Sequence, residues 1–171
     1  MTRLLALLCF TGLFACPVGV PEDDAGTTPP TGDGGTTSAC PPLPSDGGTR
    51  HSDVLGSPDE VWTAAGNPHV ITFPLRVRSG EKLTLEPCVV VRLEHDDGLE
   101  VRAGGELVAE GTAAQPIRFE RQEADPWGQL YISGGATAKL AYLTLEGGAA
   151  LSNSRPADVG MLRVGIDPND D

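Results

Sequence analysis

Aromatic residues are scarce in this chain of 171 residues, since Phe, Trp and Tyr together make up only 5% of it. A core built around large rings is therefore not expected, and Val, Leu and Ile must fill most of any core. The chain also contains 22 glycines and 15 prolines, which interrupt regular structure often. Both features favour short strands joined by turns over long helices.

Basic residues are scarce as well. The chain has 12 Lys and Arg against 24 Asp and Glu, which gives a formal net charge of −12. Such a chain is repelled by the phosphates of nucleic acids and by an anionic membrane surface. We therefore expect no nucleic-acid partner, and contact with a membrane only through a covalent lipid anchor.

The sequence also lacks the motifs of common catalytic and metal-binding chemistry. It has no Ser/His/Asp order, no phosphate-binding glycine loop and no Cys-x-x-Cys pair. His51 and His69 are isolated, without the spacing of metal ligands. The sequence therefore predicts no catalytic residue, no metal site and no cofactor, and it does not favour an enzyme.

An export signal is predicted at residues 1–15. Arg3 precedes an apolar run that is too short to span a bilayer. The run ends in Leu13-Phe14-Ala15-Cys16, which resembles the lipobox of bacterial lipoproteins, where the cysteine is lipidated and becomes the new N-terminus. This resemblance predicts lipidation of Cys16. The alternative is an ordinary secretory signal that leaves Cys16 as a thiol or a disulfide partner.

Residues 16–49 are rich in Pro, Gly, Thr and Asp, and such a segment cannot bury enough apolar surface to offset its ordering entropy. We expect a disordered linker there, followed by an N-terminal cap at 50–69 that includes Trp62. If Cys9 leaves with the signal and Cys16 carries lipid, Cys40 and Cys88 remain as an even pair in an oxidising compartment. A disulfide between them is a hypothesis, because spacing alone gives no distance.

Two stretches, residues 77–86 and 101–110, share Val, Arg, Gly, Leu and Glu at the same places. An internal repeat of this length indicates stacked copies of one unit. Apolar residues recur two apart with glycine between the runs, which predicts strand, turn and strand. Equivalent points in successive copies are Leu75, Leu99, Leu130 and Leu162. Residues 70–171 are therefore predicted to form about three to four coils, ended by truncation or by an acidic guard.

The segments 79–83, 103–107, 110–119 and 126–128 carry a wider resemblance. They are similar to the right-handed parallel β-helix repeat family, the pectate-lyase-like architecture of many exported bacterial proteins. The resemblance implies an all-β short solenoid in which each coil has three strands with Leu, Val and Ile facing inward. An antiparallel sandwich is the structural alternative, because alternation of apolar residues does not give strand direction.

Polysaccharide lyases of this architecture use acidic residues, often with calcium, on one outer face. The nearest equivalent here is a candidate ligand corner, in which the repeat places one acidic turn beside another. Its residues are His95, Asp96, Asp97, Asp125 and Trp127. The competing interpretation is that the acidic turn only solubilises the corner and that Trp127 lies beneath a loop.

The sequence thus predicts a noncatalytic lipoprotein that is exported and anchored in the bacterial cell envelope, at the outer membrane or cell surface. Its β-helix would be a spacer or would bind a cell-surface or extracellular polysaccharide or protein. The alternative is a fragment of a polysaccharide-acting, lyase-like β-helix enzyme. Fold resemblance alone does not separate the two.

Overall fold

The computed structural model describes residues 39–45, 47–149 and 160–165. Short strands, β1 to β13, make up nearly all regular structure in these ranges, with one 3-10 helix, η1 (Ala64–Gly66). The predicted signal at 1–15, Cys16 and the linker up to residue 38 lie outside the described residues. The fold of the described residues is all-β, in agreement with the prediction from scarce aromatic residues and abundant glycine and proline.

The strands form three parallel sheets, which we call A, B and C. Sheet A contains β1 (Thr49–His51), β3 (His69–Ile71), β6 (Val90–Leu93), β9 (Ile117–Arg121) and β12 (Leu143–Leu145). Sheet B contains β4 (Leu75–Val77), β7 (Leu99–Val101), β10 (Leu130–Ser133) and β13 (Leu162–Gly165). Sheet C contains β2 (Asp59–Trp62), β5 (Lys82–Leu85), β8 (Glu106–Glu110) and β11 (Thr137–Ala141). Every pair of named neighbouring strands is parallel, which excludes the antiparallel sandwich for the described residues.

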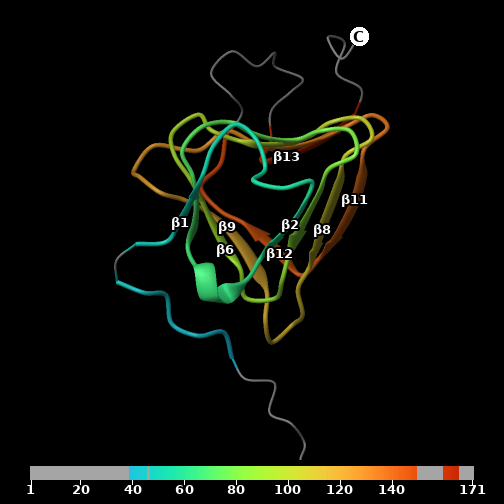
Figure 1. The fold of residues 1–171 in the computed structure, drawn as a ribbon. Helices are drawn as coiled ribbons and strands as arrows, with labels where there is room; N and C mark the ends of the chain where they lie inside the picture. Colours follow the sequence, from blue (N-terminus) through green and yellow to red (C-terminus); the bar gives the residue numbers. More distant parts are fainter. Residues whose placement is uncertain (1–38, 46, 150–159, 166–171) are drawn as a thin grey trace, which may run out of the picture. The chain divides into compact units, whose positions relative to one another are not determined.

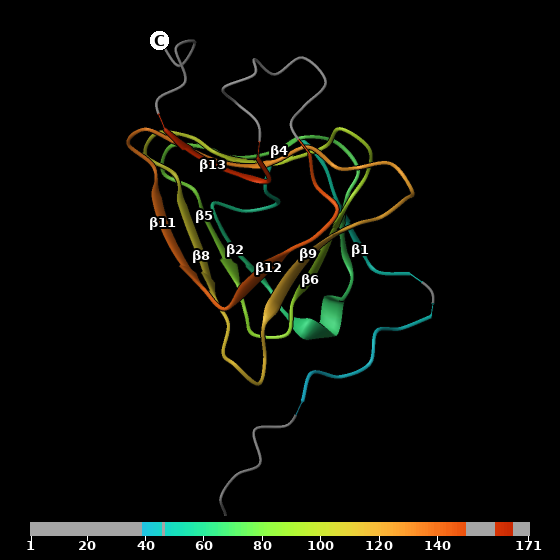
Figure 2. The same ribbon diagram turned by 180° about the vertical axis from the view of Figure 1, so that it is seen from behind.

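From β2 onward the chain visits the sheets in a fixed rotation, C, then A, then B. Figures 1 and 2 show the three sheets as the sides of a triangle around a common interior. Each return to a sheet adds the next parallel strand beside the previous one. Residues one repeat apart in the sequence therefore become direct neighbours.

The register of the strands agrees with the sequence repeat. Leu99 pairs with Leu75 on one side and with Leu130 on the other, and Leu130 pairs with Leu162. Leu75, Leu99 and Leu130 are each at most 1% exposed, whereas Leu162 on the edge strand β13 is 43% exposed. Each fully buried Leu contributes roughly 1.5–3 kcal/mol through removal of its side chain from water.

Glycines turn the chain between sheets B and C. Gly80 and Gly104 have φ of 78° and 77°, a left-handed conformation that costs other residues energy. The Gly80 amide donates to the Gly104 carbonyl at 2.9 Å, so these corners also stack. A Cβ on Gly104 would come within 2.5 Å of Ser79 Oγ, whereas one on Gly80 would meet nothing within 4 Å.

Residues 50–69, predicted as a cap, continue two of the sheets. They provide part of β1 and all of β2, which pair with β3 and β5 as the outermost strands of sheets A and C. Trp62, on β2, is 1% exposed and belongs to the same apolar cluster as the leucines. The large indole therefore fills the interior at this end of the sheets.

A disulfide joins Cys40 to Cys88, with their Cα atoms 5.2 Å apart. It connects the segment before β1 to the turn between β5 and β6. Beside it, the buried Asn67 side chain donates to the Cys88 carbonyl and accepts from the Val90 amide, both at 2.8 Å. The start of sheet A is thus fixed by one covalent bond and by two buried hydrogen bonds.

Candidate functional site

The acidic turn at the predicted ligand corner lies between β6 and β7. His95 Nδ1 is 3.2 Å from the Pro126 carbonyl oxygen, and His95 Nε2 is 3.4 Å from Asp96 Oδ2. The Asp96 amide donates to the Pro126 carbonyl at 3.4 Å, with φ of 59° at Asp96. The structure therefore brings this turn against the 125–127 segment, as the repeat predicts.

Asp97 is the buried member of the turn, with 8% exposure. Burial raises the pKa of its carboxyl to about 6, and the nearby Glu94 and Asp96 carboxylates add to the shift. Its backbone carbonyl accepts a hydrogen bond from the Gly128 amide at 2.7 Å, which ties the two turns together. Asp97 is thus a carboxyl that exchanges a proton near pH 6.

The other predicted corner residues are placed differently. Trp127 is 0% exposed, its Nε1 donates to the Glu146 carbonyl at 2.8 Å, and its ring lies 6.4 Å from that of Phe119. It therefore belongs to the core and offers no exposed ring for a ligand, whereas Asp125 is exposed. Within the described ranges, no group of three or more His, Cys, Asp or Glu could hold a metal ion.

Basic side chains near the corner are engaged in other contacts. Arg92 Nε donates to Glu120 Oε1 at 2.9 Å, and Arg121 Nη1 donates to the Ala124 carbonyl at 3.2 Å. A lyase-like site needs a cation directed at the substrate. In this arrangement both guanidinium groups bind the protein itself.

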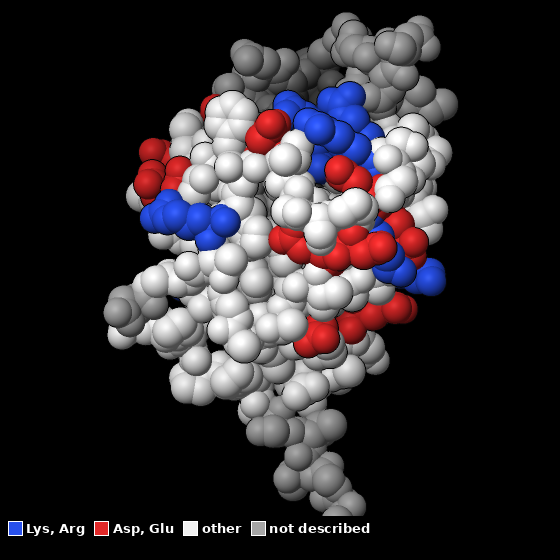
Figure 3. Space-filling view, viewed as in Figure 1, with Lys and Arg blue, Asp and Glu red and all other residues white. Residues whose placement is uncertain are grey.

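Opposite charges face each other across neighbouring strands on the outer surface. Directly paired residues form three such bridges. They are Arg76–Glu100 at 3.3 Å in sheet B, Lys82–Glu106 at 3.3 Å in sheet C and Arg92–Glu120 at 2.9 Å in sheet A. Figure 3 shows acidic and basic side chains beside one another on one face. Each exposed pair contributes about 0–1 kcal/mol, so the pattern matters more for register than for stability.

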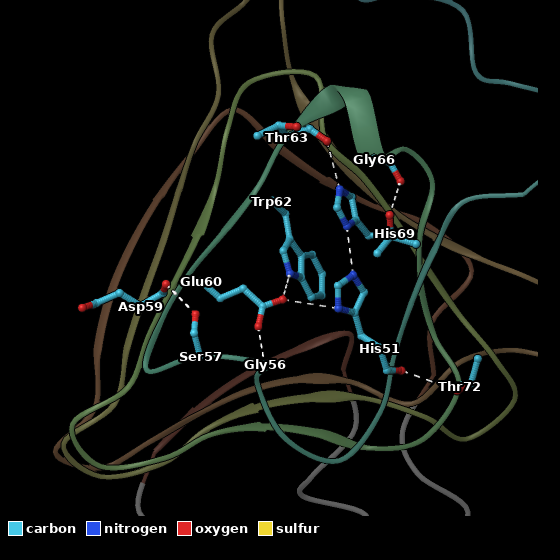
Figure 4. Close-up of polar contacts among 11 residues, drawn as sticks. His51, Gly56, Ser57, Asp59, Glu60, Trp62, Thr63, Gly66, His69 and Thr72 are labelled. Carbon is cyan, nitrogen blue, oxygen red and sulfur yellow. Dashed lines mark hydrogen bonds and ion pairs between the residues drawn. The ribbon is translucent and has the colours of Figure 1, made fainter.

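A second polar cluster lies at the N-terminal end of the sheets, where sequence analysis predicted no site. The rings of His51, Trp62 and His69 stack there, with His51–Trp62 centroids 3.9 Å apart and Trp62–His69 centroids 4.8 Å apart. Figure 4 shows the two imidazoles and the Glu60 carboxylate converging beside the indole. We call His51, Glu60, Trp62, Thr63 and His69 the histidine cluster.

Hydrogen bonds link the two imidazoles to each other and to Thr63, and an ion-pair distance separates them from Glu60. His69 Nε2 lies 2.9 Å from the Thr63 carbonyl oxygen, and His69 Nδ1 lies 3.0 Å from His51 Nε2. His51 Nδ1 is 3.4 Å from Glu60 Oε1. The carboxylate also accepts the Trp62 indole N–H at 2.6 Å and the Gly56 amide at 2.5 Å.

Burial governs the charge of both imidazoles. It lowers the pKa of His51 to about 4, an effect that His69 reinforces and Glu60 opposes. Burial also lowers the pKa of His69, whereas the Thr63 carbonyl and Glu60 favour its charged form. Burial therefore opposes a positive charge on either imidazole.

The sequence did not reveal the histidine cluster because its members come from three strands and from Thr63, which follows β2, and only the fold brings them together. His51 lies in β1, Glu60 and Trp62 in β2, and His69 in β3. β1 spans the predicted boundary between linker and cap, so it was not expected to be a strand. The available signal was that His51, Trp62 and His69 fall within one short segment otherwise poor in aromatic residues.

No protein-family model matches the chain, and no curated protein or solved structure matches it significantly. Among the described residues, no helix is long and apolar enough to cross a membrane.

Proposed function

We propose that this chain is a noncatalytic lipoprotein of the bacterial cell envelope. Its sheets would be the three faces of a right-handed parallel β-helix that acts as a spacer or binding surface. The fixed rotation through sheets C, A and B supports this architecture, and so does the in-register pairing of Leu75, Leu99 and Leu130. The anchor would be lipid on Cys16, with the module on the outer membrane or cell surface.

The observation that carries the proposal is that the tryptophans and several outward-facing basic side chains already contact other parts of the protein. Trp127 and Trp62 are buried, and three outward-facing cations bind carboxylates on neighbouring strands. Side chains that would polarise or cleave a substrate are instead occupied in holding the sheets in register. A surface of this kind suits rigid display, or recognition of a polysaccharide or protein by shape and negative charge.

Location is tested by mass spectrometry of the mature N-terminus after expression in a bacterium that processes lipoproteins. We expect Cys16 to be the first residue and to carry a diacylglyceryl group, with the protein in the membrane fraction. The Cys16→Ala variant should lose the lipid and leave that fraction. An unmodified Cys16 thiol in the wild-type protein would contradict the anchor.

One observation favours the alternative of a polysaccharide-acting enzyme. Asp97 has a pKa of about 6, in the range that suits a general acid. A lyase absorbance assay on acidic polysaccharides separates the two functions, alongside a glycan array for binding. We expect no turnover by the full chain, and turnover that disappears in Asp97→Asn but persists in Asp125→Asn would replace the noncatalytic proposal.

A further inference from the structure

The outermost strand of sheet A, β1, contributes one side chain to the interior. Thr49 and Arg50 are exposed, and Arg50 lies 3.5 Å from Glu94 on the outer surface. The ring of His51 instead stacks on the buried indole of Trp62, with 3.9 Å between the centroids. The attachment of β1 to the interior of the sheets therefore depends on His51.

The hydrogen bonds of the two imidazoles fix which nitrogen carries each proton. The Thr63 carbonyl oxygen can only accept, so His69 Nε2, at 2.9 Å, is the donor. A neutral imidazole has one N–H, which leaves His69 Nδ1 as the acceptor for the Nε2–H of His51 at 3.0 Å. Two neutral rings therefore satisfy both hydrogen bonds, and His51 Nδ1 keeps a lone pair 3.4 Å from Glu60 Oε1.

This arrangement opposes the uptake of protons. A proton added to His51 goes to Nδ1, beside Glu60, and places a positive charge in a site whose burial disfavours it. A proton added to His69 goes to Nδ1, toward which the Nε2–H of His51 already points. With both rings charged, two N–H groups face each other across 3.0 Å, and a hydrogen bond is replaced by repulsion between like charges.

The groups around the two rings determine the direction of the effect. Burial is the largest influence, because it lowers the pKa of His51 to about 4 and also lowers the pKa of His69. Glu60, on β2, is the carboxylate that faces the rings, and it favours their charged forms without overcoming burial. The other charged side chains on the neighbouring strands and turns are exposed or paired with other groups. They are Arg50, Asp53, Asp59, Lys82, Glu86 and Arg92.

We propose that His51 and His69 form a pH-sensitive switch, which keeps β1 paired with β3 while both rings are neutral and releases β1 as the rings take up protons in acid. Release uncovers the indole of Trp62, against which both rings stack. The Cys40–Cys88 disulfide lies outside β1 and keeps the preceding segment attached beside β6, so release is local and reversible.

The sign of the pH dependence follows from the lowered pKa values. In the released strand the pKa of His51 returns to 6.5, against about 4 in the closed cluster. The closed state is therefore fully favoured above about pH 6.5, and this advantage is lost as pH falls toward about 4. His51 alone lowers the ratio of closed to released β1 by about 100-fold between pH 7 and pH 4, and His69 adds to the loss.

Two NMR measurements on the full chain, with the disulfide intact, test the switch. The first uses 15N-labelled histidine, and we expect the Nε2–H tautomer for both His51 and His69 at pH 7. The second measures amide hydrogen exchange, corrected for the intrinsic effect of pH. The Thr49 amide donates to the Pro68 carbonyl and the Thr72 amide to the His51 carbonyl, both at 3.0 Å. The protection of these two amides should fall about 100-fold from pH 7 to pH 4.

Substitutions separate the two imidazoles from other titrating groups. The double variant His51→Gln with His69→Gln should lose the pH dependence at β1, because glutamine stays neutral across this range. His95→Gln, which changes an exposed imidazole, should retain the pH dependence. Asp97→Asn, which removes a carboxyl with a pKa of about 6 in another turn, should retain it as well.

The Arg118 amide, which donates to the Val89 carbonyl at 3.0 Å within sheet A, is the internal control and should keep its protection. A parallel loss of protection at Arg118 would mean global unfolding and would overturn the switch. Unchanged protection of β1 at pH 4 would overturn it too, whether the rings are charged or neutral. The same holds for an Nδ1–H tautomer in either ring at pH 7, or for a pH dependence that persists in the double variant.

Discussion

The carboxyl of Asp97 is held in the turn between β6 and β7, where it is 8% exposed and close to Glu94 and Asp96. Its pKa is about 6 in the folded chain and 3.8 in an unperturbed carboxyl. The folded state therefore binds this proton more tightly than the unfolded state does. The stability that the group contributes is complete below about pH 3.8 and is lost as pH rises through about 6.

Asp97→Asn should consequently stabilise the protein at pH 7, by about 2 kcal/mol. The amide is neutral at every pH, so it removes the cost of a buried charge and its repulsion from two neighbours. Urea unfolding at pH 4 and at pH 7 measures the effect as the difference between wild type and variant. Asp125→Asn, on the exposed part of the same corner, is the control and should change neither value by much.

A loss of stability in Asp97→Asn at pH 7 would contradict this account. It would show that the ionised carboxylate makes favourable contacts in the turn. The pH dependence of the difference then distinguishes the cases, because a stabilising carboxylate gives a slope of opposite sign.

At the scale of elements, glycine at the corners between sheets B and C serves two purposes. It permits a left-handed backbone, and at one corner it avoids a clash with a neighbouring side chain. Gly80 and Gly104 share the same left-handed backbone, but only Gly104 is packed against a neighbouring corner. Gly80→Ala should destabilise the protein by about 1–2 kcal/mol through backbone strain alone. Gly104→Ala should lose more than Gly80→Ala, because its Cβ would also meet the Ser79 side chain.

Thermal or urea unfolding of both variants measures the difference. The double variant Gly104→Ala with Ser79→Gly removes the obstructing hydroxymethyl group and should recover part of the loss. Equal destabilisation by Gly80→Ala and Gly104→Ala would show that the stacked corners do not constrain each other.

Four leucines pair in a row across sheet B, and the last of them is much more exposed than the others. They are Leu75, Leu99, Leu130 and Leu162. Leu99→Ala removes a side chain that is 1% exposed and has paired neighbours on both sides, so it should cost about 2–5 kcal/mol. Leu162→Ala, at the 43% exposed end of the same row, should cost far less. Equilibrium unfolding of the two variants measures both losses of stability. Similar losses would argue against an apolar interior that is buried at Leu99 and open at Leu162.

At the scale of the whole molecule, the Cys40–Cys88 disulfide closes a loop with a sequence separation of 48 residues. A cross-link of that size restricts the unfolded chain, and replacing both cysteines with alanine should cost about 4 kcal/mol. Differential scanning calorimetry of wild type and the double variant provides the measurement. An unchanged melting temperature would mean that Asn67 and the strands alone hold this end.

The part of the architecture that could be predicted from the sequence is the part set by residues that recur in every repeat. Leu75, Leu99, Leu130 and Leu162 recur at matching points, and glycine marks the corners, so parallel strands in this register follow from the repeat. The contact of the His95 turn with Pro126 follows in the same way. A repeat carries such information because each copy must match its neighbour.

The histidine cluster could not be predicted, because nothing in it is repeated. Its residues come from the first copy of the unit, where the pattern of the later copies is replaced by Trp62 and two imidazoles.

The sequence left two interpretations of Trp127 open, a ligand contact at the corner or a position beneath a loop. Only its packing near Phe119 and its hydrogen bond to the Glu146 carbonyl decide for the buried position. Which face an isolated side chain occupies depends on contacts that local pattern does not encode.

The cross-link between Cys40 and Cys88 also determines how the module would carry load. Tension applied upstream of Cys40 reaches the strands through a covalent bond at Cys88, and it bypasses β1 to β5. β1 to β5 and the histidine cluster therefore lie in a loop that carries none of this tension. Force applied upstream of Cys40 would therefore enter the sheets next to β6, and β1 to β5 would bear it only after the disulfide is reduced.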